Sequence, residues 1–332
     1  MNIPANHPPV KTPRIGVLLV NLGTPEAPTS SAVRRYLKQF LSDGRVVEIP
    51  ALIWQPILRG IILNVRPRKS AANYAKVWMA NGSPLAVYTK AQAKNLQARL
   101  GDAIDVRYAM RYGEPAVARQ LEAMKADGCN RILLAPLYPQ YSGATTATVV
   151  DEAFRALAGM RWQPALRTLP AYHDDPAYIS ALAATLNAQL AKLDFEPDAI
   201  VASFHGMPER TLHLGDPYHC HCQKTARLLS EALGKPLTIA FQSRFGRAKW
   251  LEPSTEDTIK RLAAEGKTKI ALFAPGFSAD CLETLEELAM QGKEQFEEAG
   301  GERYAYLSCL NASEPGMAML EALIRRELSG WL

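Results

Sequence analysis

The chain has 332 residues, 48% of them hydrophobic and 21% charged, and a formal net charge of +5 at pH 7. This length is enough for two domains, each with its own core. Because Lys and Arg residues are spread along the chain, the mild positive charge argues against nucleic-acid binding and is compatible with an anionic ligand or membrane surface. Five cysteines at scattered spacings argue against a disulfide framework and for a reducing compartment.

Short β-rich runs alternate along the chain with amphipathic stretches of helical length. Most of these runs are continuously apolar, as in strands that are buried on both faces of a sheet. The alternation predicts an α/β fold in which helices cover parallel sheets. The predicted strands are residues 15–21, 103–110, 131–137, 165–169, 199–204, 237–241, 269–273 and 304–307. Helices are expected between them, for example at residues 115–127, 217–233, 280–299 and 314–328.

Eight strands can form one sheet or two sheets of four. We expect two Rossmann-like lobes, each a four-stranded parallel sheet flanked by helices, facing a cleft, because candidate functional residues follow strands in both halves. The expected lobes are residues 14–140, completed by a C-terminal helix at 312–332, and residues 141–311, with the crossover at 136–142. The sequence contains no G-x-G-x-x-G motif after a strand and no P-loop, which disfavours a nucleotide site.

The strongest local signal is SFHGMP at residues 203–208, directly after a predicted strand. In open α/β sheets, ligands bind beyond the carboxyl ends of the strands, which is where His205 is expected. A histidine at this place can accept a proton near neutral pH or ligate a divalent metal. The alternative is a structural histidine that hydrogen-bonds a loop.

A row of acidic residues follows the predicted strand 269–273. On an α-helix, Asp280, Glu283 and Glu287 would share one face. A purely structural role is also open, since acids in a first turn complement the helix dipole and Asp280 could be the N-cap. A histidine opposite a row of carboxylates would suit metal handling with proton transfer.

The segment 213–222 carries a third cluster of possible metal ligands. Adjacent residues point in different directions, and only two thiols are local, so a permanent zinc or iron–sulfur site is not expected. We expect the start of a surface helix, with transient metal contact as the alternative. The cluster consists of His213, His219, Cys220, His221 and Cys222.

The first half of the chain supplies aromatic and basic groups instead. Examples are Arg66, Arg68, Tyr74, Arg111 and Tyr138. Each could be a turn or core residue, but together they would suit a flat aromatic ligand that carries carboxylates, held by stacking and by ion pairs.

An apolar segment at residues 51–63 (ALIWQPILRGIIL) is too short to span a membrane and is interrupted by Pro56 and Arg59. Residues 1–13 lack the apolar stretch of a signal peptide. We therefore expect a cytoplasmic protein, and a periplasmic-type binding protein is disfavoured.

Several motifs, in their order and spacing, make the chain resemble bacterial ferrochelatases over nearly its whole length. The matching segments are VNLGTPE (20–26), NGSPL (81–85), MRYGEP (110–115), LYPQYSGATT (137–146), SFHGMP (203–208), GDPYHCHC (215–222), FQSRFGRAKWLEPST (241–255) and DCLETLEE (280–287).

This resemblance implies the two-lobed chelatase fold and insertion of Fe²⁺ into protoporphyrin IX to form protohaem, a lyase reaction of haem biosynthesis. It implies that His205 and Glu283 are the catalytic and metal-binding residues. It further implies an acidic proton or metal path through Asp280 and Glu287. Porphyrin-pocket residues are implied at Tyr74, Arg66, Arg111, Tyr138 and Trp250.

The resemblance also bears on cofactors and partners. Animal ferrochelatases hold a [2Fe–2S] cluster with a Cys-bearing extension and a further ligand, where this chain ends at Leu332 and has Gly143. We therefore expect no permanently bound cofactor, with Fe²⁺ as substrate. The apolar segment 51–63 would be a lip at the cleft mouth that associates peripherally with an anionic inner membrane. A monomer or a homodimer is expected.

Iron insertion requires two pyrrole protons to leave, and a bent macrocycle presents its nitrogen lone pairs better than a planar one. His205 would act as proton acceptor or transient iron ligand, and Glu283 would carry protons or position Fe²⁺; these roles could be reversed. The remaining alternative is a chelatase for another metal or tetrapyrrole, such as a cobalt chelatase or a coproporphyrin ferrochelatase.

Overall fold

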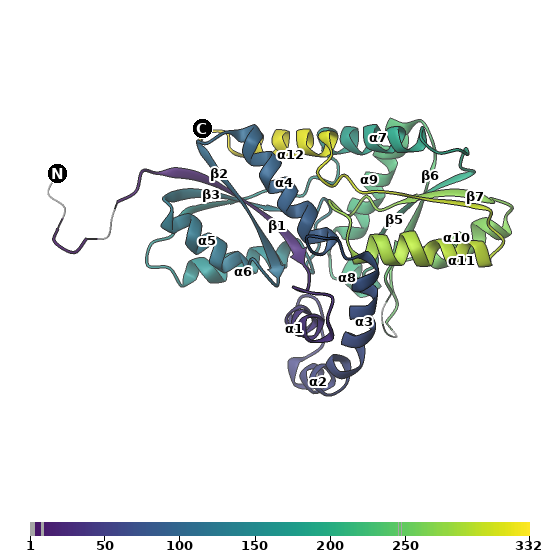
Figure 1. The fold of residues 1–332 in the computed structure, drawn as a ribbon, viewed down its shortest axis with the longest axis horizontal. Coiled ribbons are helices and arrows are strands. Elements are labelled where there is room, and N and C mark those ends of the chain that lie inside the picture. The colour runs from purple at the N-terminus through teal and green to yellow at the C-terminus, as the bar shows by residue number, and fades with distance from the viewer. Residues whose placement is uncertain (1–3, 8–9, 245, 247) are drawn as a thin grey trace.

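The computed structural model describes residues 4–7, 10–244, 246 and 248–332, so residues 245 and 247 of the motif at 241–255 lie outside the described residues. The chain forms two four-stranded parallel sheets, one in each half, flanked by helices (Figure 1). The predicted α/β fold with two such sheets is confirmed. The first sheet has the order β2-β1-β3-β4 and comprises β1 Arg14–Gly23, β2 Ile104–Tyr112, β3 Cys129–Pro136 and β4 Ala165–Thr168. The second has the order β6-β5-β7-β8 and comprises β5 Ala199–His205, β6 Leu237–Gln242, β7 Lys269–Phe273 and β8 Arg303–Leu307.

The central strands are the most apolar. Residues 17–20 of β1 and residues 201, 202 and 204 of β5 have no exposed surface, because helices cover both faces of each sheet. Helices of the first half are α1 Ser30–Leu41, α4 Pro84–Leu100, α5 Val117–Ala126 and α6 Thr146–Ala158. Those of the second half are α7 Pro176–Leu190, α8 Glu209–His213, α9 Tyr218–Leu233, α10 Thr255–Ala264, α11 Gly292–Glu298 and α12 Glu314–Glu327, with a π-helix η2 at Glu283–Gln291.

The order of strands is the same in both sheets, and local details repeat as well. At the end of β1, a Cβ on Gly23 would lie 1.7 Å from the carbonyl oxygen of Tyr112 on the neighbouring strand. At the matching place after β5, a Cβ on Gly206 would lie 2.5 Å from the carbonyl oxygen of Gln242. A glycine therefore stands at the end of β1 and directly after β5, because the chain there passes too close to a neighbouring backbone for any side chain.

Two helices are exchanged between the halves. After β4, α7 crosses to the second sheet, where Gln189 hydrogen-bonds the backbone of Ser308 just after β8. After β8, α12 crosses back to the first half, where Arg99 pairs with Glu314 and Glu321. Since β4 pairs with β3, the first sheet extends past the boundary expected at residue 140, and the chain leaves it only after Thr168. The C-terminal helix packs on the first half, in line with the expectation, and also on α7 (Figure 1).

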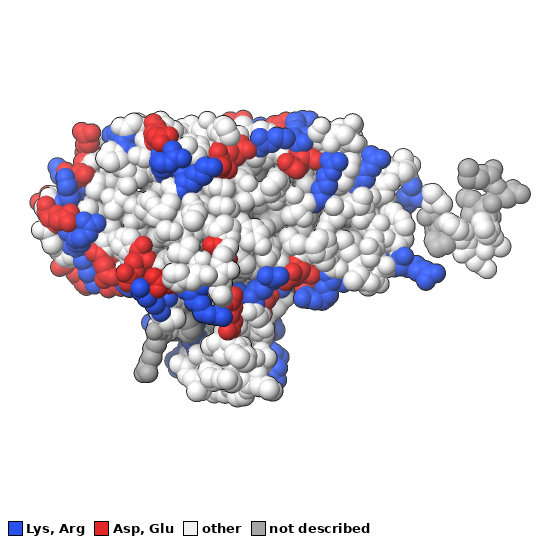
Figure 2. All heavy atoms as spheres, turned by 180° about the vertical axis from the view of Figure 1, so that it is seen from behind, with Lys and Arg blue, Asp and Glu red and all other residues white. Residues whose placement is uncertain are grey.

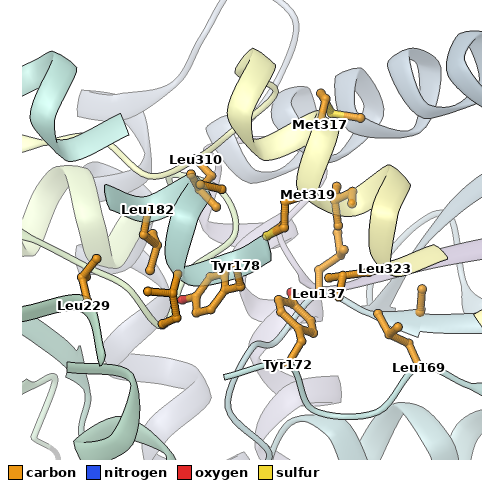
Figure 3. Packing of buried hydrophobic residues seen from close by; sticks show 14 of the residues in the cluster. Leu137, Leu169, Tyr172, Tyr178, Leu182, Leu229, Leu310, Met317, Met319 and Leu323 are labelled. Carbon is orange, nitrogen blue, oxygen red and sulfur yellow. The ribbon is translucent and has the colours of Figure 1, made fainter. Parts of the chain in front are cut away.

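The exchange gives the two lobes one shared hydrophobic cluster, while each lobe also keeps a cluster of its own. A single hydrophobic cluster runs from Leu137 and Leu169 near the first sheet, through Tyr178 of α7 and Leu323 of α12, to Leu229 of α9 (Figure 3). Close packing across this boundary holds the two lobes in one relative orientation.

The connection between β1 and α4 projects from the body of the molecule. It contains α2 Ala51–Ile57, a π-helix η1 Leu58–Ile62 and α3 Leu63–Val77; we refer to residues 42–77 as the lip. Trp54 and Leu58 are buried inside it, whereas Leu52 is 93% exposed. Figure 2 shows the tip of the lip almost free of charged side chains. None of the helices among the described residues is long and apolar enough to cross a membrane.

Candidate active site

A large cavity lies between the two lobes and the lip, with a volume of about 1470 Å³. This exceeds the range of about 300–1,000 Å³ that is usual for small-molecule sites. Its wall combines the carboxyl ends of the central strands with aromatic side chains from all three parts. The aromatic lining residues are Tyr36, Phe40, Trp54, Tyr74, Tyr138, Tyr218, Phe241, Trp250 and Phe277. Such a wall suits a large, flat and mostly apolar ligand.

His205 is the last residue of β5 and lines this cavity. Its Nδ1 lies 2.6 Å from the carbonyl oxygen of Gly206, which can only accept, so Nδ1 carries the proton in the neutral ring. Nε2 is then the nitrogen with the lone pair. The backbone around it is held by Tyr218, whose hydroxyl donates to the His205 carbonyl at 3.0 Å, and by the Gly206 amide, which donates to Gln242 O at 2.7 Å. The imidazole is thus available for proton transfer or metal ligation through Nε2.

Glu287 on η2 lines the same cavity. The Ser243 amide donates to its Oε1 at 2.7 Å, and the Ser243 hydroxyl donates to Oε2. Burial is the largest influence and raises the pKa of Glu287, although Ser243 and the nearby His205 oppose the rise. The expectation of a raised pKa in the acidic row is confirmed for this residue, with burial rather than carboxylate repulsion as the main cause.

Glu283 also lines the cavity, close enough to Cys281 to raise the pKa of that buried thiol, second to the effect of burial itself. It lies near the hydroxyls of Tyr36 and Tyr74, whose pKa values are raised chiefly by burial and further by Glu283. His205, Glu283 and Glu287 therefore share one cavity, as the sequence predicted.

The expectation of a single acidic face on an α-helix is wrong, because residues 283–291 form a π-helix with i→i+5 hydrogen bonds and Asp280 precedes it. Asp280 is 2% exposed and does not line the cavity. Its carboxylate accepts hydrogen bonds from Tyr306 Oη at 2.7 Å and Asn311 Nδ2 at 2.6 Å. These contacts make Asp280 a structural carboxylate rather than part of a path from the cavity.

Four of the five predicted pocket residues line the cavity: Tyr74, Tyr138, Trp250 and Arg66. The exception is Arg111, which is 7% exposed and lies outside the lining. Its Nη2 pairs with Asp43 at 2.5 Å and its Nε donates to the Thr148 carbonyl at 2.7 Å. A buried guanidinium needs an anion beside it, and Asp43 supplies that anion. The Arg111–Asp43 pair therefore joins the base of the lip to the first sheet and does not contribute to the cavity wall.

The His–Cys cluster is dispersed. Cys220 is exposed, whereas Cys222 is buried, and burial raises the pKa of its thiol. His221 stacks on His173 with ring centroids 3.5 Å apart and accepts a hydrogen bond from the Tyr141 amide. Within the described part of the chain, no three His, Cys, Asp or Glu side chains gather closely enough to hold a metal ion. Cys220 and Cys222 thus lie in different environments, one at the surface and one in the core.

Two residues of the site were not singled out from the sequence. Phe277 lies with its ring centroid 6.4 Å from that of His205, and Ser243 holds Glu287 from the loop after β6. Phe277 comes shortly after β7, and His205 is the last residue of β5. A position near the carboxyl end of a strand therefore indicates both residues as site candidates. Nothing in the local sequence around Ser243 predicts a contact with a residue 44 positions away.

Two parallel-sheet lobes around a large cavity make up the chelatase fold. The chain is similar in structure to SirB from Bacillus subtilis, solved with Fe³⁺ (TM-score 0.59, 11% identity, 96% of this chain and 97% of that chain). It is also similar to CbiX, the terminal enzyme for siroheme biosynthesis in denitrifying bacteria (TM-score 0.55, 17% identity, 95% and 100%). At these identities the likeness concerns the fold alone. The family is shown by sequence: the Ferrochelatase family model matches residues 14–328, and the chain belongs to the ferrochelatase family.

Curated relatives agree with this family over their full length. The chain is 54% identical to the ferrochelatase of Rhizobium meliloti, covering 100% of both proteins. It is 53% identical to that of Agrobacterium fabrum, over 99% of this chain and 98% of the relative. It is 52% identical to the ferrochelatase of Azoarcus sp., over 99% of this chain and 92% of the relative.

Proposed function

We propose that this chain is a protohaem ferro-lyase that inserts Fe²⁺ into protoporphyrin IX, with release of two protons. One observation carries this proposal: a lone-pair nitrogen of His205 and the carboxylates of Glu283 and Glu287 line a single aromatic-walled cavity of about 1470 Å³. A porphyrin is large, flat and apolar, and its metalation needs both proton acceptors and a place for the incoming ion.

His205 is proposed to act on one face of the macrocycle through Nε2. The hydrogen bond from Nδ1 to Gly206 O fixes the tautomer and ring orientation, so Nε2 can accept a pyrrole proton or ligate Fe²⁺ transiently. A weak, open site of this kind suits a metal that is transferred rather than kept.

Glu283 is proposed to handle protons or Fe²⁺ next to the ring, with Glu287 as the next group outward. The raised pKa of Glu287 brings its titration closer to neutral pH, where a carboxyl group can both take up and release a proton. Asp280 is left out of this path because its carboxylate is held by Tyr306 and Asn311.

The porphyrin is proposed to lie against Tyr74, Tyr138 and Trp250, with its two propionates near basic lining residues such as Arg66. Burial lowers the pKa of Arg66, which stays a cation at neutral pH. Walls from both lobes and the lip can hold the ring bent, and a bent ring presents its nitrogen lone pairs to iron.

The lip is proposed to contact a membrane surface from the cytoplasmic side. Its apolar side chains Leu52, Ile53, Ile61 and Val65 are each more than half exposed, and Trp54, Arg66 and Lys69 of the same segment line the cavity. An apolar substrate can therefore move from the lipid to the cavity along the surface of the lip. We further propose that no cofactor is permanently bound; an EPR signal of a [2Fe–2S] centre lost on Cys220→Ser would contradict this.

The decisive experiment follows the visible absorbance of the purified protein with protoporphyrin IX and Fe²⁺ under anaerobic, reducing conditions. The proposal expects conversion of the free-base spectrum to that of haem. Parallel reactions with Co²⁺ and with coproporphyrin test the alternative chelatase substrates. Failure with protoporphyrin and Fe²⁺, together with turnover of another pair, would reassign the substrate.

A further inference from the structure

The lip and the second lobe meet at one end of the cavity, where α3 packs against η2. The contacts at this junction include a hydrophobic contact and an ion pair, and a second ion pair, of Glu48 with Arg210 on α8, links the lip to the second lobe as well. Leu282, directly before η2, packs into the hydrophobic cluster of the lip that contains Trp54 and Tyr74. In addition, Lys76 Nζ on α3 donates to Glu286 Oε1 on η2 at 2.9 Å. The two elements are far apart in the sequence, since α3 ends at Val77 and η2 begins at Glu283.

The ion pair is unequal in its exposure. The side chain of Glu286 is 5% exposed and that of Lys76 is 52% exposed. Gln291 donates to both carboxylate oxygens of Glu286 at 2.9 Å, but an amide supplies no positive charge. A buried carboxylate without a cation is strongly destabilising, so Lys76 is the group that allows a charged Glu286 at this place.

The same two elements carry neighbouring parts of the cavity wall. Tyr74 lies two residues before Lys76 and lines the cavity on the lip side. Glu283 lies three residues before Glu286 and lines it on the η2 side, and Glu286 itself contributes to the wall. The contact between α3 and η2 therefore sets a distance within the site. This is the distance between Tyr74, which would hold the porphyrin, and Glu283, which would handle protons or iron.

We propose that Lys76 is a positioning residue, whose ion pair with Glu286 clamps the lip helix onto η2 and so sets the spacing between Tyr74 and Glu283. This inference rests on the proposed function for its catalytic consequence, while the clamp itself is a property of the protein without substrates. A loosened clamp should impair chemistry more than porphyrin binding, because the aromatic walls remain and only their distance from Glu283 changes.

The test compares Lys76→Met, Lys76→Arg and the double variant Lys76→Met/Glu286→Gln. Lys293→Met is the matched control, since Lys293 on α11 of the second lobe is 53% exposed, much like Lys76, and pairs with the exposed Glu297. Lys76→Met should lower kcat roughly tenfold with little change in KM for porphyrin. Lys76→Arg should retain activity. The double variant should regain part of the loss, because it removes the buried charge that Lys76→Met leaves uncompensated.

Hydrogen exchange without substrates gives a second readout. Lys76→Met should speed amide exchange in α3 and η2, and Lys293→Met should not. Normal exchange in Lys76→Met would overturn the clamp even if kcat fell, as would a double variant no better than Lys76→Met. Lack of iron insertion by the unaltered protein would refute the proposed function, but the exchange result would still decide whether the clamp exists.

Discussion

At the scale of single residues, the site depends on what holds each side chain. The orientation of His205 is set by the Gly206 carbonyl, and that of Glu287 by Ser243. Glycine at position 206 is required because the chain passes 2.5 Å from Gln242 O at the place where a Cβ would stand. Proton-transfer groups work only when their geometry is fixed in advance, and here backbone groups supply much of that fixation.

We predict that His205→Ala abolishes iron insertion while the fold and porphyrin binding persist, since the aromatic walls are untouched. The measurement is kcat with protoporphyrin and Fe²⁺, alongside porphyrin binding by absorbance. A variant that keeps more than about a tenth of the original kcat would have lost less than about 1.4 kcal/mol of transition-state stabilisation. That loss is too small for an essential proton acceptor, and the role would have to be reassigned.

The three glutamates of η2 should differ in their effects. Glu283→Gln removes the titrating group proposed to act at the ring and should lower kcat by roughly 10² or more. Glu287→Gln should be milder and should change the acid limb of the pH profile, because a carboxyl with a raised pKa becomes protonated as the pH falls and then cannot accept a proton. Steady-state kinetics of each variant across pH would measure both effects.

Glu286→Gln should lower kcat less than Lys76→Met does, although Glu286 is buried and lines the cavity. A glutamine oxygen can still accept from Lys76, and the half-exposed ammonium can be solvated when its anion is lost. Equal losses at Glu283, Glu286 and Glu287 would show that the row acts only as a general electrostatic patch.

At the scale of elements, η2 and the lip decide how the cavity is built. The π-helical turn of η2 carries Glu283, Glu286 and Glu287 along the cavity wall, and π-helical turns are frequent at functional sites. The lip buries Trp54, whose Nε1 donates to the Leu41 carbonyl at 2.6 Å. Trp54 is therefore part of the lip's core, and an exposed residue must be changed to test surface contact.

We predict that Leu52→Ser with Ile61→Ser weakens liposome binding, because these side chains are 93% and 58% exposed at the tip of the lip. Flotation with anionic vesicles measures the binding, which should also weaken as salt is raised. Phe154→Ser is a matched control, since Phe154 is 54% exposed on α6, outside the lip. If the unaltered protein does not bind anionic vesicles at low salt, the membrane proposal is wrong.

At the scale of the whole molecule, the exchanged helices and the shared core join the lobes, and a polar network crosses the same boundary. Ser142 Oγ and the Gly143 amide donate to Asp216, and the Tyr141 amide donates to His221 Nδ1. The stack of His221 on His173 completes this network. Because Nδ1 of His221 acts as an acceptor, the network needs a neutral imidazole.

The histidine pair should make stability depend on pH. Burial lowers the pKa of His173 to about 4, helped by His221, and burial also lowers the pKa of His221. The neighbouring Asp174 raises both pKa values, Asp216 raises that of His221, and Lys224 lowers both. In the unfolded chain a histidine titrates near pH 6.5. The unfolded state therefore binds more protons below pH 6.5, and stability is lost as the pH falls from about 6.5 toward 4.

We predict that the free energy of unfolding drops between pH 7 and pH 5 because of this pair, with at most about 2 kcal/mol of the drop from His173. His173→Phe keeps a flat ring in the stack but cannot titrate, so its denaturation midpoints should vary less over that range. His213→Gln, at an exposed position at the end of α8, should behave like the unaltered protein. Identical pH dependence in His173→Phe and the unaltered chain would exclude the pair as the cause.

The sequence by itself determined the elements and the principal chemistry of this protein. Short β-rich runs, most of them continuously apolar, predicted all eight strands, since a strand buried on both faces is apolar throughout. A histidine and acids after strands of the second half predicted His205 and Glu283 in one cavity.

Only the tertiary structure decided which charged residues belong to the site. Asp280 accepts a hydrogen bond from Asn311, 31 positions away, and Arg111 pairs with Asp43, 68 positions away, so neither side chain lines the cavity. Glu286 is drawn to the lip by Lys76, 210 positions away. The pairing of a buried charge depends on which distant residue the fold brings within hydrogen-bond reach, and local sequence pattern carries no information about that.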